Sequence, residues 1–452
     1  MRRVEILESP VHLCFVLCLS NLNHLRAIVP VLPHFLCSMI HVSFPRPLSK
    51  VTQAVVIITI TLSICFGLSH VSGTPSLSQH RVFPDDRITT ASAKDGNATL
   101  LAAAPAYIQA IMNSSDTTFP RLECRQINSA RYGYLGYSDT DQKYFFALDL
   151  HESAKLLPRL LGSIVETMNF LGPERCSLSV VEGHSNDGTF EILKLLRNAI
   201  EKTGATYHFV SSPLDTSQGE RIEKLAQLRN LAVEPLVTSS SIADTTVIFF
   251  NDVAICSEDI LELLHQRIYQ AADMTCGMDW TYVGQDPTFY DVWIARGMTG
   301  DSFFNIPEDG NWNSAWNLFW NDDASRQKLN SHQPFQVFSC WNGATAFSGK
   351  VLKKVQFRHS KKNECYQGEP KLFCKDMWHQ GFGRIAVVPT VNIEYSDEAA
   401  MKIKALKGHV SDWAGKPEST DEKIEWAMKP PEKVKCMRNY GDQIWVPWDE
   451  NI

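Results

Sequence analysis

Acidic side chains follow two apolar segments of this chain, at the points where the segments end. Asn251 and Asp252 come directly after residues 246–250, and Glu182 follows residues 176–181. If both segments are buried parallel strands, these side chains lie at the edge of the sheet where open α/β folds bind ligands. A carboxylate there can hold Mg²⁺ or Mn²⁺, since both ions prefer oxygen ligands, or accept hydrogen bonds from a base or ribose. An Asp252 that only lies in a surface turn is an equal alternative.

Two arginines and an amide lie in residues 219–235, which are expected to form a helix. Arg221 and Arg229 fall on one face of that helix, and Asn230 follows Arg229. Two guanidinium groups on one face can clamp a diphosphate, although a solvated helix face explains them equally well. The sequence has no G-x-x-x-x-G-K-[ST] or G-x-S-x-G motif, and no G-x-G-x-x-G follows residues 176–181. P-loop NTPases, serine hydrolases and Rossmann dehydrogenases are therefore disfavoured.

The elements that must position these residues alternate along the chain. Apolar runs predict strands at residues 144–150, 176–181, 207–210 and 246–250, and helical periodicity predicts helices at residues 155–170, 190–202 and 219–235. Ser257 is expected to cap a further amphipathic helix. The apolar character of residues 246–250 suits a strand buried on both faces. This alternation predicts an α/β fold, with a parallel sheet covered by helices on both faces.

The composition is globular, and the N-terminal part contains a candidate membrane anchor. The 452 residues carry a net charge of −7, which gives no support for general nucleic-acid binding. Residues 51–68 are uncharged and almost wholly apolar, and basic residues precede them. We therefore expect residues 51–71 to be the signal anchor of a single-pass type II membrane protein, after an apolar region, 1–50, of uncertain role. A late, cleaved signal peptide is the alternative.

Residues 72–120 are expected to form a stem without regular structure, because they are rich in Ser, Thr, Ala and Pro and show no sustained periodicity. Both N-x-[ST] sequons, at Asn97 and Asn113, lie in this segment, which suits a lumenal location. Eight of the 12 cysteines follow it and are expected to form disulfides, with Cys365 and Cys374 as the favoured local pair. No C-x-x-C motif occurs, so a structural zinc site is disfavoured.

Several motifs follow one another between residues 144 and 395. They are Asn251-Asp252-Val253 and residues 276–280, 289–296, 339–343, 364–365 and 372–378. Together they resemble the fungal capsule-associated α-1,3-mannosyltransferase family, glycosyltransferase family 69. The resemblance implies a GT-A-like, Rossmann-type nucleotide-sugar transferase domain at residues 121–395, with an extension, 396–452, that packs on the domain or trails it. It also implies a Golgi enzyme with a lumenal catalytic domain. Such an enzyme moves mannose from GDP-mannose to a mannose-containing glycan, with retention of configuration and with Mn²⁺ or Mg²⁺.

Such a transfer requires a neutralised diphosphate, a bound sugar and an activated acceptor hydroxyl. The candidate donor-binding residues are Glu182, Arg221, Arg229, Asn230, Asn251 and Asp252, and the candidate metal ligands are Asp252 and His379. A lone His such as His379 is also readily explained as structural. The candidate catalytic acids are Asp279, Asp376 and Glu364, with Glu369 as a further acid, and the candidate sugar-binding residues are Trp280, Trp341 and Asn342.

Two other functions stay open on the sequence. Asn251-Asp252 offers one carboxylate where many GT-A enzymes have two, so a non-catalytic lumenal scaffold of a glycan-synthesis complex is an alternative. All 11 tryptophans lie after residue 279, which would suit a carbohydrate-binding module or a second apolar core. The strand–helix alternation of the first half argues against the binding module, which has no need of a nucleotide-type sheet.

Overall fold

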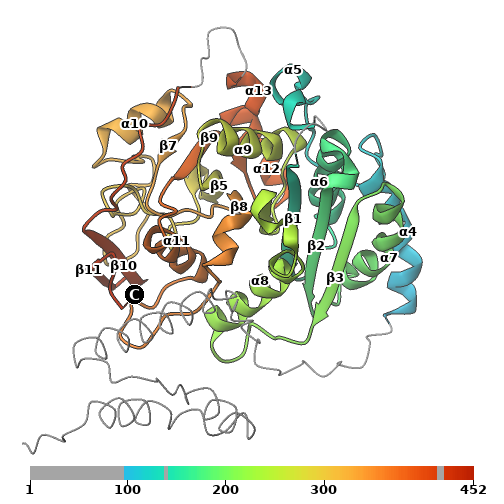
Figure 1. Ribbon diagram of the computed structural model, residues 1–452, viewed down its shortest axis with the longest axis horizontal. Helices are drawn as coiled ribbons and strands as arrows, with labels where there is room; N and C mark the ends of the chain where they lie inside the picture. Colours follow the sequence, from blue (N-terminus) through green and yellow to red (C-terminus); the bar gives the residue numbers. More distant parts are fainter. Residues whose placement is uncertain (1–95, 137–140, 415–421, 452) are drawn as a thin grey trace, which may run out of the picture. The chain divides into compact units, whose positions relative to one another are not determined.

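The computed structural model describes residues 96–136, 141–414 and 422–451 (Figure 1). The expected anchor at 51–71, the region 1–50 and the first part of the expected stem lie outside these residues. Among the described residues, no helix combines the length and apolar character needed to cross a membrane.

The first half of the fold confirms the predicted alternation of strands and helices. The strands are β1 (Lys143–Leu150), β2 (Cys176–Gly183), β3 (Thr206–Ser212) and β4 (Thr245–Phe250), and the helices are α6 (Leu157–Leu171), α7 (Thr189–Lys202), α8 (Arg221–Val237) and α9 (Ser257–Tyr269). These strands pair in parallel in the order β3-β2-β1-β4. Every residue of β4 is buried, as its apolar sequence predicts.

The second half of the sheet is mixed, so the predicted parallel sheet is confirmed for β1 to β4 and does not extend to the remaining strands. The order continues from β4 through β8 (Ala344–Ser348), β5 (Met274–Val283), β9 (Ile385–Ile393) and β7 (Phe335–Gln336), with β6 (Asp286–Phe289) paired to β5. Strand β8 is antiparallel to both β4 and β5. An antiparallel neighbour needs no helical crossover, so the strand–helix rhythm that predicted the first half does not continue here.

Apolar side chains of β1 and β4 point alternately into two cores. Phe146 and Ile248 join the core under α6, α7 and α9, whereas Phe145 and Phe249 join the core under α8 and α11 (Glu369–His379). Both strands are therefore fixed on two faces. The polar residues at their carboxyl ends are held by a rigid sheet.

Residues 96–120 are folded, so the expected stem without structure is wrong for this part. Helix α4 (Ala98–Met112) packs against α6 and α7 (Figure 1), and Ala104, Ala110 and Ile111 are buried there. The Asn97 side chain caps α4, and the Asn97 N–H donates to Glu191 Oε1 at 2.8 Å. The buried face consists largely of alanines, which give too weak a periodicity to show in the sequence. The two sequons flank this helix, and both Asn97 and Asn113 are exposed.

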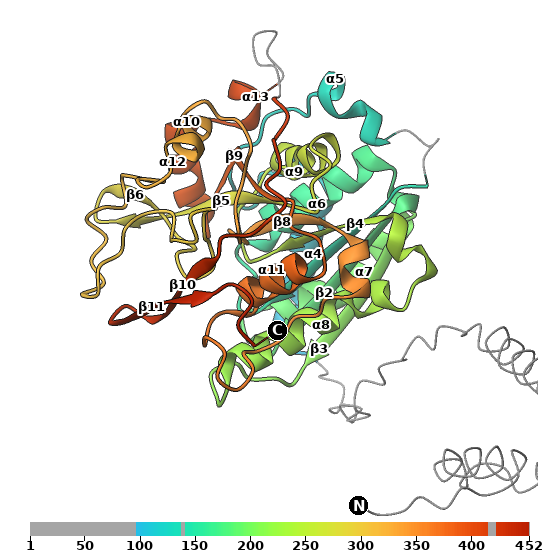
Figure 2. The same cartoon turned by 60° about the vertical axis from the view of Figure 1, so that its left-hand side comes forward.

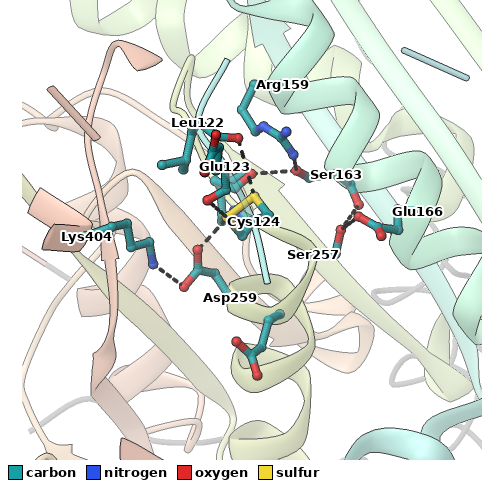
Figure 3. Close-up of a disulfide and its surroundings, with 12 residues drawn as sticks. Leu122, Glu123, Cys124, Arg159, Ser163, Glu166, Ser257, Asp259 and Lys404 are labelled. Atoms are coloured by element: carbon teal, nitrogen blue, oxygen red, sulfur yellow. Dashed lines mark hydrogen bonds and ion pairs between the residues drawn. A yellow bond between two sulfur atoms is a disulfide. The ribbon is translucent and has the colours of Figure 1, made fainter. Parts of the chain in front are cut away.

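The start of α9 is stabilised differently from the prediction. Ser257 lies in the first turn and donates to the Glu166 carboxylate, while Asp259 accepts a hydrogen bond from the Cys256 N–H at 3.0 Å and caps the helix (Figure 3). Asp259 also forms an ion pair of 2.6 Å with Lys404. Asp259 is therefore a buried structural acid.

Three disulfides link distant parts of the described chain: Cys124–Cys256, Cys276–Cys340 and Cys365–Cys436. The first ties the segment before α5 (Ser129–Tyr132) to the start of α9 (Figure 3). The expected Cys365–Cys374 pair is wrong, since Cys374 is a buried free thiol within α11. A C-terminal strand brings Cys436 to Cys365, and sequence separation alone could not show this.

The C-terminal segment packs on the domain. It contains α12 (Asp397–Lys407), α13 (Val410–Trp413) and a hairpin of β10 (Lys433–Asn439) and β11 (Asp442–Pro447) (Figure 2). The remaining elements are α10 (Asp323–Asn330) and four 3-10 turns at Gly133–Gly136, Pro173–Arg175, Ser240–Asp244 and Gly349–Lys353. The hairpin is tied to the loop before α11 by the Cys365–Cys436 disulfide. It thereby reaches the edge of the sheet where the polar residues gather.

Candidate active site

A cavity of about 680 Å³ lies at the carboxyl ends of β1, β2 and β4. Asp149 is the last but one residue of β1, Gly183 ends β2, and Asn251 and Asp252 follow β4; all four line the cavity. Helix α8, residues 290–294, the loop before α11 and β10 supply the other walls. The predicted position of Asn251 and Asp252, at the edge of the sheet after β4, is therefore confirmed.

Arg229 of α8 is the centre of the polar network in this cavity. Its Nε donates to Glu369 Oε1 at 2.8 Å, and its Nη1 lies 3.8 Å from Asp149 Oδ1. Its guanidinium carbon lies 4.7 Å from the centre of the Trp341 ring, and Nη2 donates to Asn251 Oδ1 at 3.3 Å. Burial alone would lower the pKa of Arg229, but the surrounding carboxylates raise it, so the side chain is a fixed cation.

Carboxylates outnumber this cation around the cavity. Burial raises the pKa of Asp149 to about 6, and the nearby charges of Glu369 and Asp252 oppose its ionisation further. Burial also raises the pKa of Asp291 to about 6, although its Oδ2 accepts a hydrogen bond of 2.9 Å from the Asn342 N–H. The Asp252 side chain is exposed to the cavity. Loss of water around its carboxylate, which the cavity walls partly enclose, raises its pKa as well. The cavity can therefore bind a cation or exchange a proton near neutral pH.

A further acid, Asp279, is buried behind the wall of the cavity. Tyr395 lines the cavity and donates its hydroxyl to Asp279 Oδ2 at 2.6 Å. Asp279 is fully buried, and burial together with the charge of Asp291 raises its pKa well above the usual range. It does not line the cavity, but it contacts two residues of the wall, Tyr395 through a hydrogen bond and Asp291 through its charge.

Residues 143–376 match the family described as cryptococcal mannosyltransferase 1. The chain is also 34% identical, over 316 residues, to the alpha-1,3-mannosyltransferase CMT1 of Cryptococcus neoformans, covering 65% of this chain and 67% of that protein. The chain belongs to this mannosyltransferase family. The resemblance seen in the sequence is confirmed, and with it the assignment of the chain to the glycosyltransferases.

Similarity to solved structures is weaker. S. aureus TarS in complex with UDP gives 14% identity and a TM-score of 0.34, with 59% of this chain and 65% of that chain covered. The mannosyltransferase PcManGT from Pyrobaculum calidifontis, solved with GDP-Man and Mn²⁺, gives 11% identity and a TM-score of 0.35, with 66% and 68% covered. At this level of similarity, neither structure bears on the candidate active site of this protein.

Of the predicted donor-binding residues, four lie in the cavity and two do not. Arg221, Arg229, Asn251 and Asp252 line it. Glu182 is buried behind the wall and accepts hydrogen bonds from the Ser185 N–H and the Ser211 hydroxyl, and Asn230 exchanges two hydrogen bonds with the backbone of Phe357. Glu182 and Asn230 hold loops and strands together, so the prediction that they touch the donor does not fit this geometry.

Of the three predicted sugar-binding residues, one lies in the cavity and two do not. Trp341 lines the cavity and donates its indole N–H to Asn251 Oδ1 at 3.0 Å. Asn342 is fully buried, and its amide donates to the Gly277 carbonyl. Trp280 is buried outside the cavity and donates to Asn392 Oδ1. Asn342 and Trp280 therefore stabilise the core, and a direct role in acceptor binding does not fit them.

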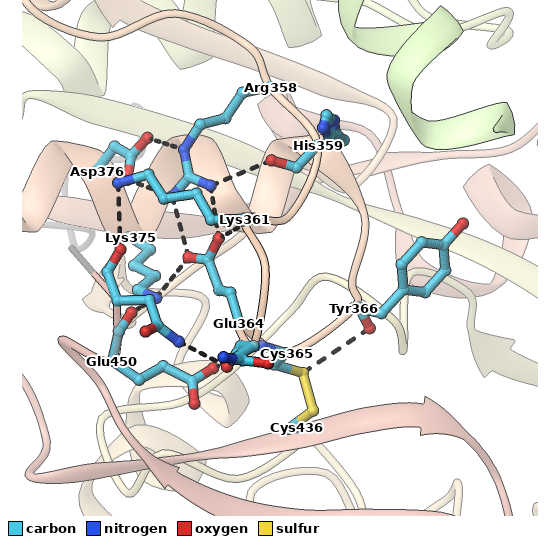
Figure 4. Close-up of polar contacts among 12 residues, drawn as sticks. Arg358, His359, Lys361, Glu364, Cys365, Tyr366, Lys375, Asp376, Cys436 and Glu450 are labelled. Atoms are coloured by element: carbon cyan, nitrogen blue, oxygen red, sulfur yellow. Dashed lines mark hydrogen bonds and ion pairs between the residues drawn. A yellow bond between two sulfur atoms is a disulfide. The ribbon is translucent and has the colours of Figure 1, made fainter.

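The acids Glu364 and Asp376 form a structural ion-pair network away from the cavity (Figure 4). Arg358 donates to both carboxylates, at 2.7 Å to Glu364 and 2.6 Å to Asp376, and Lys375 Nζ lies 2.6 Å from Glu364. Burial opposes ionisation of Glu364, but the hydrogen bonds from Arg358 and Lys375 lower its pKa to about 2. A carboxylate held in this way is a poor base, so the catalytic assignments of Glu364 and Asp376 do not fit the structure.

Of the two predicted metal ligands, Asp252 fits the cavity and His379 does not. His379 is exposed at the end of α11 and does not line the cavity, so it does not fit as a ligand of an ion held there. No group of three His, Cys, Asp or Glu side chains within the described residues could by itself hold a metal ion. Asp252 does fit, because its carboxylate faces the cavity beside the acid Asp149. Further oxygen ligands would then have to come from the substrate and from water.

Among the cavity residues for which no role was predicted are Asp149, Asp291, Tyr290 and Tyr395. Asp149 and Tyr395 carried the same signal as Asp252, since each lies at or just after the end of an apolar strand. Asp291 follows the short strand β6, whose end could not be located from its sequence. Glu369 was considered only as one of several late acids, and its contact with Arg229 places it at the site.

Proposed function

We propose that this protein transfers mannose from GDP-mannose to a mannose-containing glycan, with retention of configuration, as a GT-A-like enzyme. The observation that carries the proposal is the cavity at the carboxyl ends of β1 and β4, where Arg229, Arg221, Asp252 and Asp149 meet. Its place in the sheet is that of a nucleotide site, and its volume of about 680 Å³ suits a nucleotide sugar. The family membership supplies the donor class.

Different residues of the cavity have different roles in the proposed reaction. Arg221 is exposed to the cavity and attracts the diphosphate, whereas Arg229 is fixed by its acids and keeps Asn251 and Trp341 in place. Asp252 would hold a divalent ion, and such an ion, when bound, neutralises charge on a leaving diphosphate. Asp291, with a pKa of about 6, is ionised at neutral pH and can accept the proton of an acceptor hydroxyl.

We further propose that the enzyme acts in the Golgi lumen, behind the N-terminal anchor. The three disulfides support an oxidising compartment, and the two exposed sequons that flank α4 support glycosylation there. Endoglycosidase treatment of the full-length protein should increase its gel mobility. Unchanged mobility, together with protease access to the C-terminal half in sealed microsomes, would contradict this topology.

The proposed activity is tested by incubating the protein with a panel of nucleotide sugars, Mn²⁺ and mannobiose, followed by linkage analysis of the products. We expect a mannose-extended product from GDP-mannose alone. Tight binding of GDP-mannose without turnover onto any mannoside would instead support the non-catalytic scaffold, which the single carboxylate of Asn251-Asp252 leaves open.

A further inference from the structure

Large aromatic side chains are exposed at the wall of the cavity. Tyr290, Trp293 and Tyr366 all line it, with exposed fractions of 46%, 39% and 44%. Aromatic side chains bury a large apolar area when they are covered, so three of them left open around one cavity form a surface suited to a ligand. The network around Arg229 uses none of these three rings.

One of these rings, that of Trp293, packs against a ring of the C-terminal hairpin. The ring centres of Trp293 and Tyr440 lie 4.8 Å apart, with an angle of 32° between the planes. Tyr440 lies between β10 and β11, and its ring also lies against Gly310, where an added Cβ would come within 2.5 Å of the ring. Gly310 has φ +75°, so both space and backbone conformation require glycine there. The pair of rings is therefore fixed in position.

The hairpin that carries Tyr440 is held firmly to the domain. The Cys365–Cys436 disulfide joins β10 to the residue before Tyr366 (Figure 4), and the Lys435 N–H donates to the Gly300 carbonyl at 2.8 Å. Arg438 of β10 lines the cavity and pairs with Asp442 at 2.7 Å. Polar groups thus lie beside the aromatic rings. Such a combination suits a sugar, whose ring faces are apolar and whose edges carry hydroxyls.

We propose that Trp293, Tyr440 and Tyr366 form an aromatic platform that binds acceptor sugar units lying beyond the unit that receives mannose. This inference rests on the proposed function, because it takes the acceptor to be a glycan. Trp293 and Tyr366 line the cavity, and Trp293 packs against Tyr440 at the turn of the hairpin. An acceptor chain bound there would be longer than a disaccharide. The enzyme therefore prefers an oligosaccharide to mannobiose.

The first test compares two acceptors in the full-length protein, mannobiose and mannotetraose, with GDP-mannose as donor. Trp293→Ala should lower the ratio of kcat/KM for mannotetraose to kcat/KM for mannobiose about fivefold, through KM, which corresponds to about 1 kcal/mol. Trp293→Tyr should restore most of the ratio, because a ring is kept. The matched control is Trp316→Ala, since Trp316 is 81% exposed and does not line the cavity. An unchanged ratio for Trp293→Ala, with an unchanged melting temperature, would overturn the platform.

The second test measures binding without turnover, so that failure of the platform and failure of the proposed function can be told apart. Calorimetric titration of mannotetraose into the wild-type protein with GDP should show binding that Trp293→Ala and Tyr440→Ala both weaken. Binding of this kind without any transfer would refute the proposed activity but support the platform. Transfer onto mannotetraose with equal binding by wild type and both variants would support the activity and refute the platform.

Discussion

Replacing Asp252 with Asn distinguishes a chemical role from a structural one, because the two roles predict different changes in stability. Within the described residues, the Asp252 carboxylate forms no hydrogen bond or ion pair with another side chain, and it faces the cavity. Its charge also opposes the ionisation of Asp149. Asn keeps the size and removes that charge. The free energy of unfolding should therefore stay within about 0.5 kcal/mol of wild type or rise slightly.

The expected effect on activity is much larger. If Asp252 holds the ion that neutralises the diphosphate, its loss removes about 3 kcal/mol of transition-state stabilisation, or about 150-fold in rate. The measurement is the transfer of labelled mannose from saturating GDP-mannose to mannobiose across a Mn²⁺ titration, together with the melting temperature of the same preparation. The binding of Mn²⁺ with GDP, followed by calorimetry, should weaken in parallel.

The control must be an acid with no contact at the site. Asp259 is unsuitable, since it is buried, caps α9 and pairs with Lys404. Asp141 is exposed and lies just before β1, at the opposite end of that strand from Asp149, so Asp141→Asn should change neither property. Near-normal transfer by Asp252→Asn would refute the ligand assignment. A loss of about 1 kcal/mol of stability with little loss of activity would identify a turn residue.

Four further predictions concern buried charges and cysteines. Glu364→Gln should destabilise the fold by about 3 kcal/mol, since it leaves the buried Lys375 without a carboxylate and Arg358 with only that of Asp376, yet folded protein should keep its transfer rate. Because the folded pKa of Glu364 is depressed to about 2, its contribution to stability should be lost as pH falls from about 4.5 towards 2, measured as the melting temperature against pH. The opposite sign holds for Asp149, whose folded pKa is raised: its contribution to stability should fall as pH rises from about 4 to 6. Asp149→Asn should lose less stability than wild type over this window, because only Asp291 of the two acids with a pKa of about 6 remains, so the difference in melting temperature should grow. Mass mapping of unreduced peptides should find Cys124–Cys256, Cys276–Cys340 and Cys365–Cys436 linked, with Cys176 and Cys374 free, and a Cys365–Cys374 peptide would contradict the structure.

Local pattern explains which parts of the fold were predictable. Strands β1 to β4 and helices α6 to α9 follow from apolar runs and helical periodicity, because each element buries a face that its own sequence defines. The antiparallel position of β8 was not predictable. It depends on the path of residues 250–344, and that path carries little periodicity. Helix α4 was missed because alanines form most of its buried face.

The site was predictable to the extent that it lies at strand ends. Asn251 and Asp252 were found by this rule, and the same rule applied to β1 would have found Asp149. The catalytic roles predicted for Glu364 and Asp376 do not fit the structure, because an acid beside a motif looks the same in the sequence whether it faces a cavity or an arginine. Only the position of Arg358 shows that these carboxylates are already paired.

The cavity is assembled from two parts of the chain, and this bears on how specificity arises. The segment that matches the family, 143–376, supplies the strand-end acids and the arginines of α8, which are the groups suited to a diphosphate donor. Tyr395, Met437 and Arg438, which also line the cavity, lie beyond it. The Cys365–Cys436 disulfide joins the two parts at the aromatic wall. Trp293 and Tyr366 of the proposed platform lie within 143–376, and only Tyr440 lies on the hairpin. If the platform binds acceptor, substitutions in the hairpin can therefore alter acceptor binding without touching the groups around Arg229.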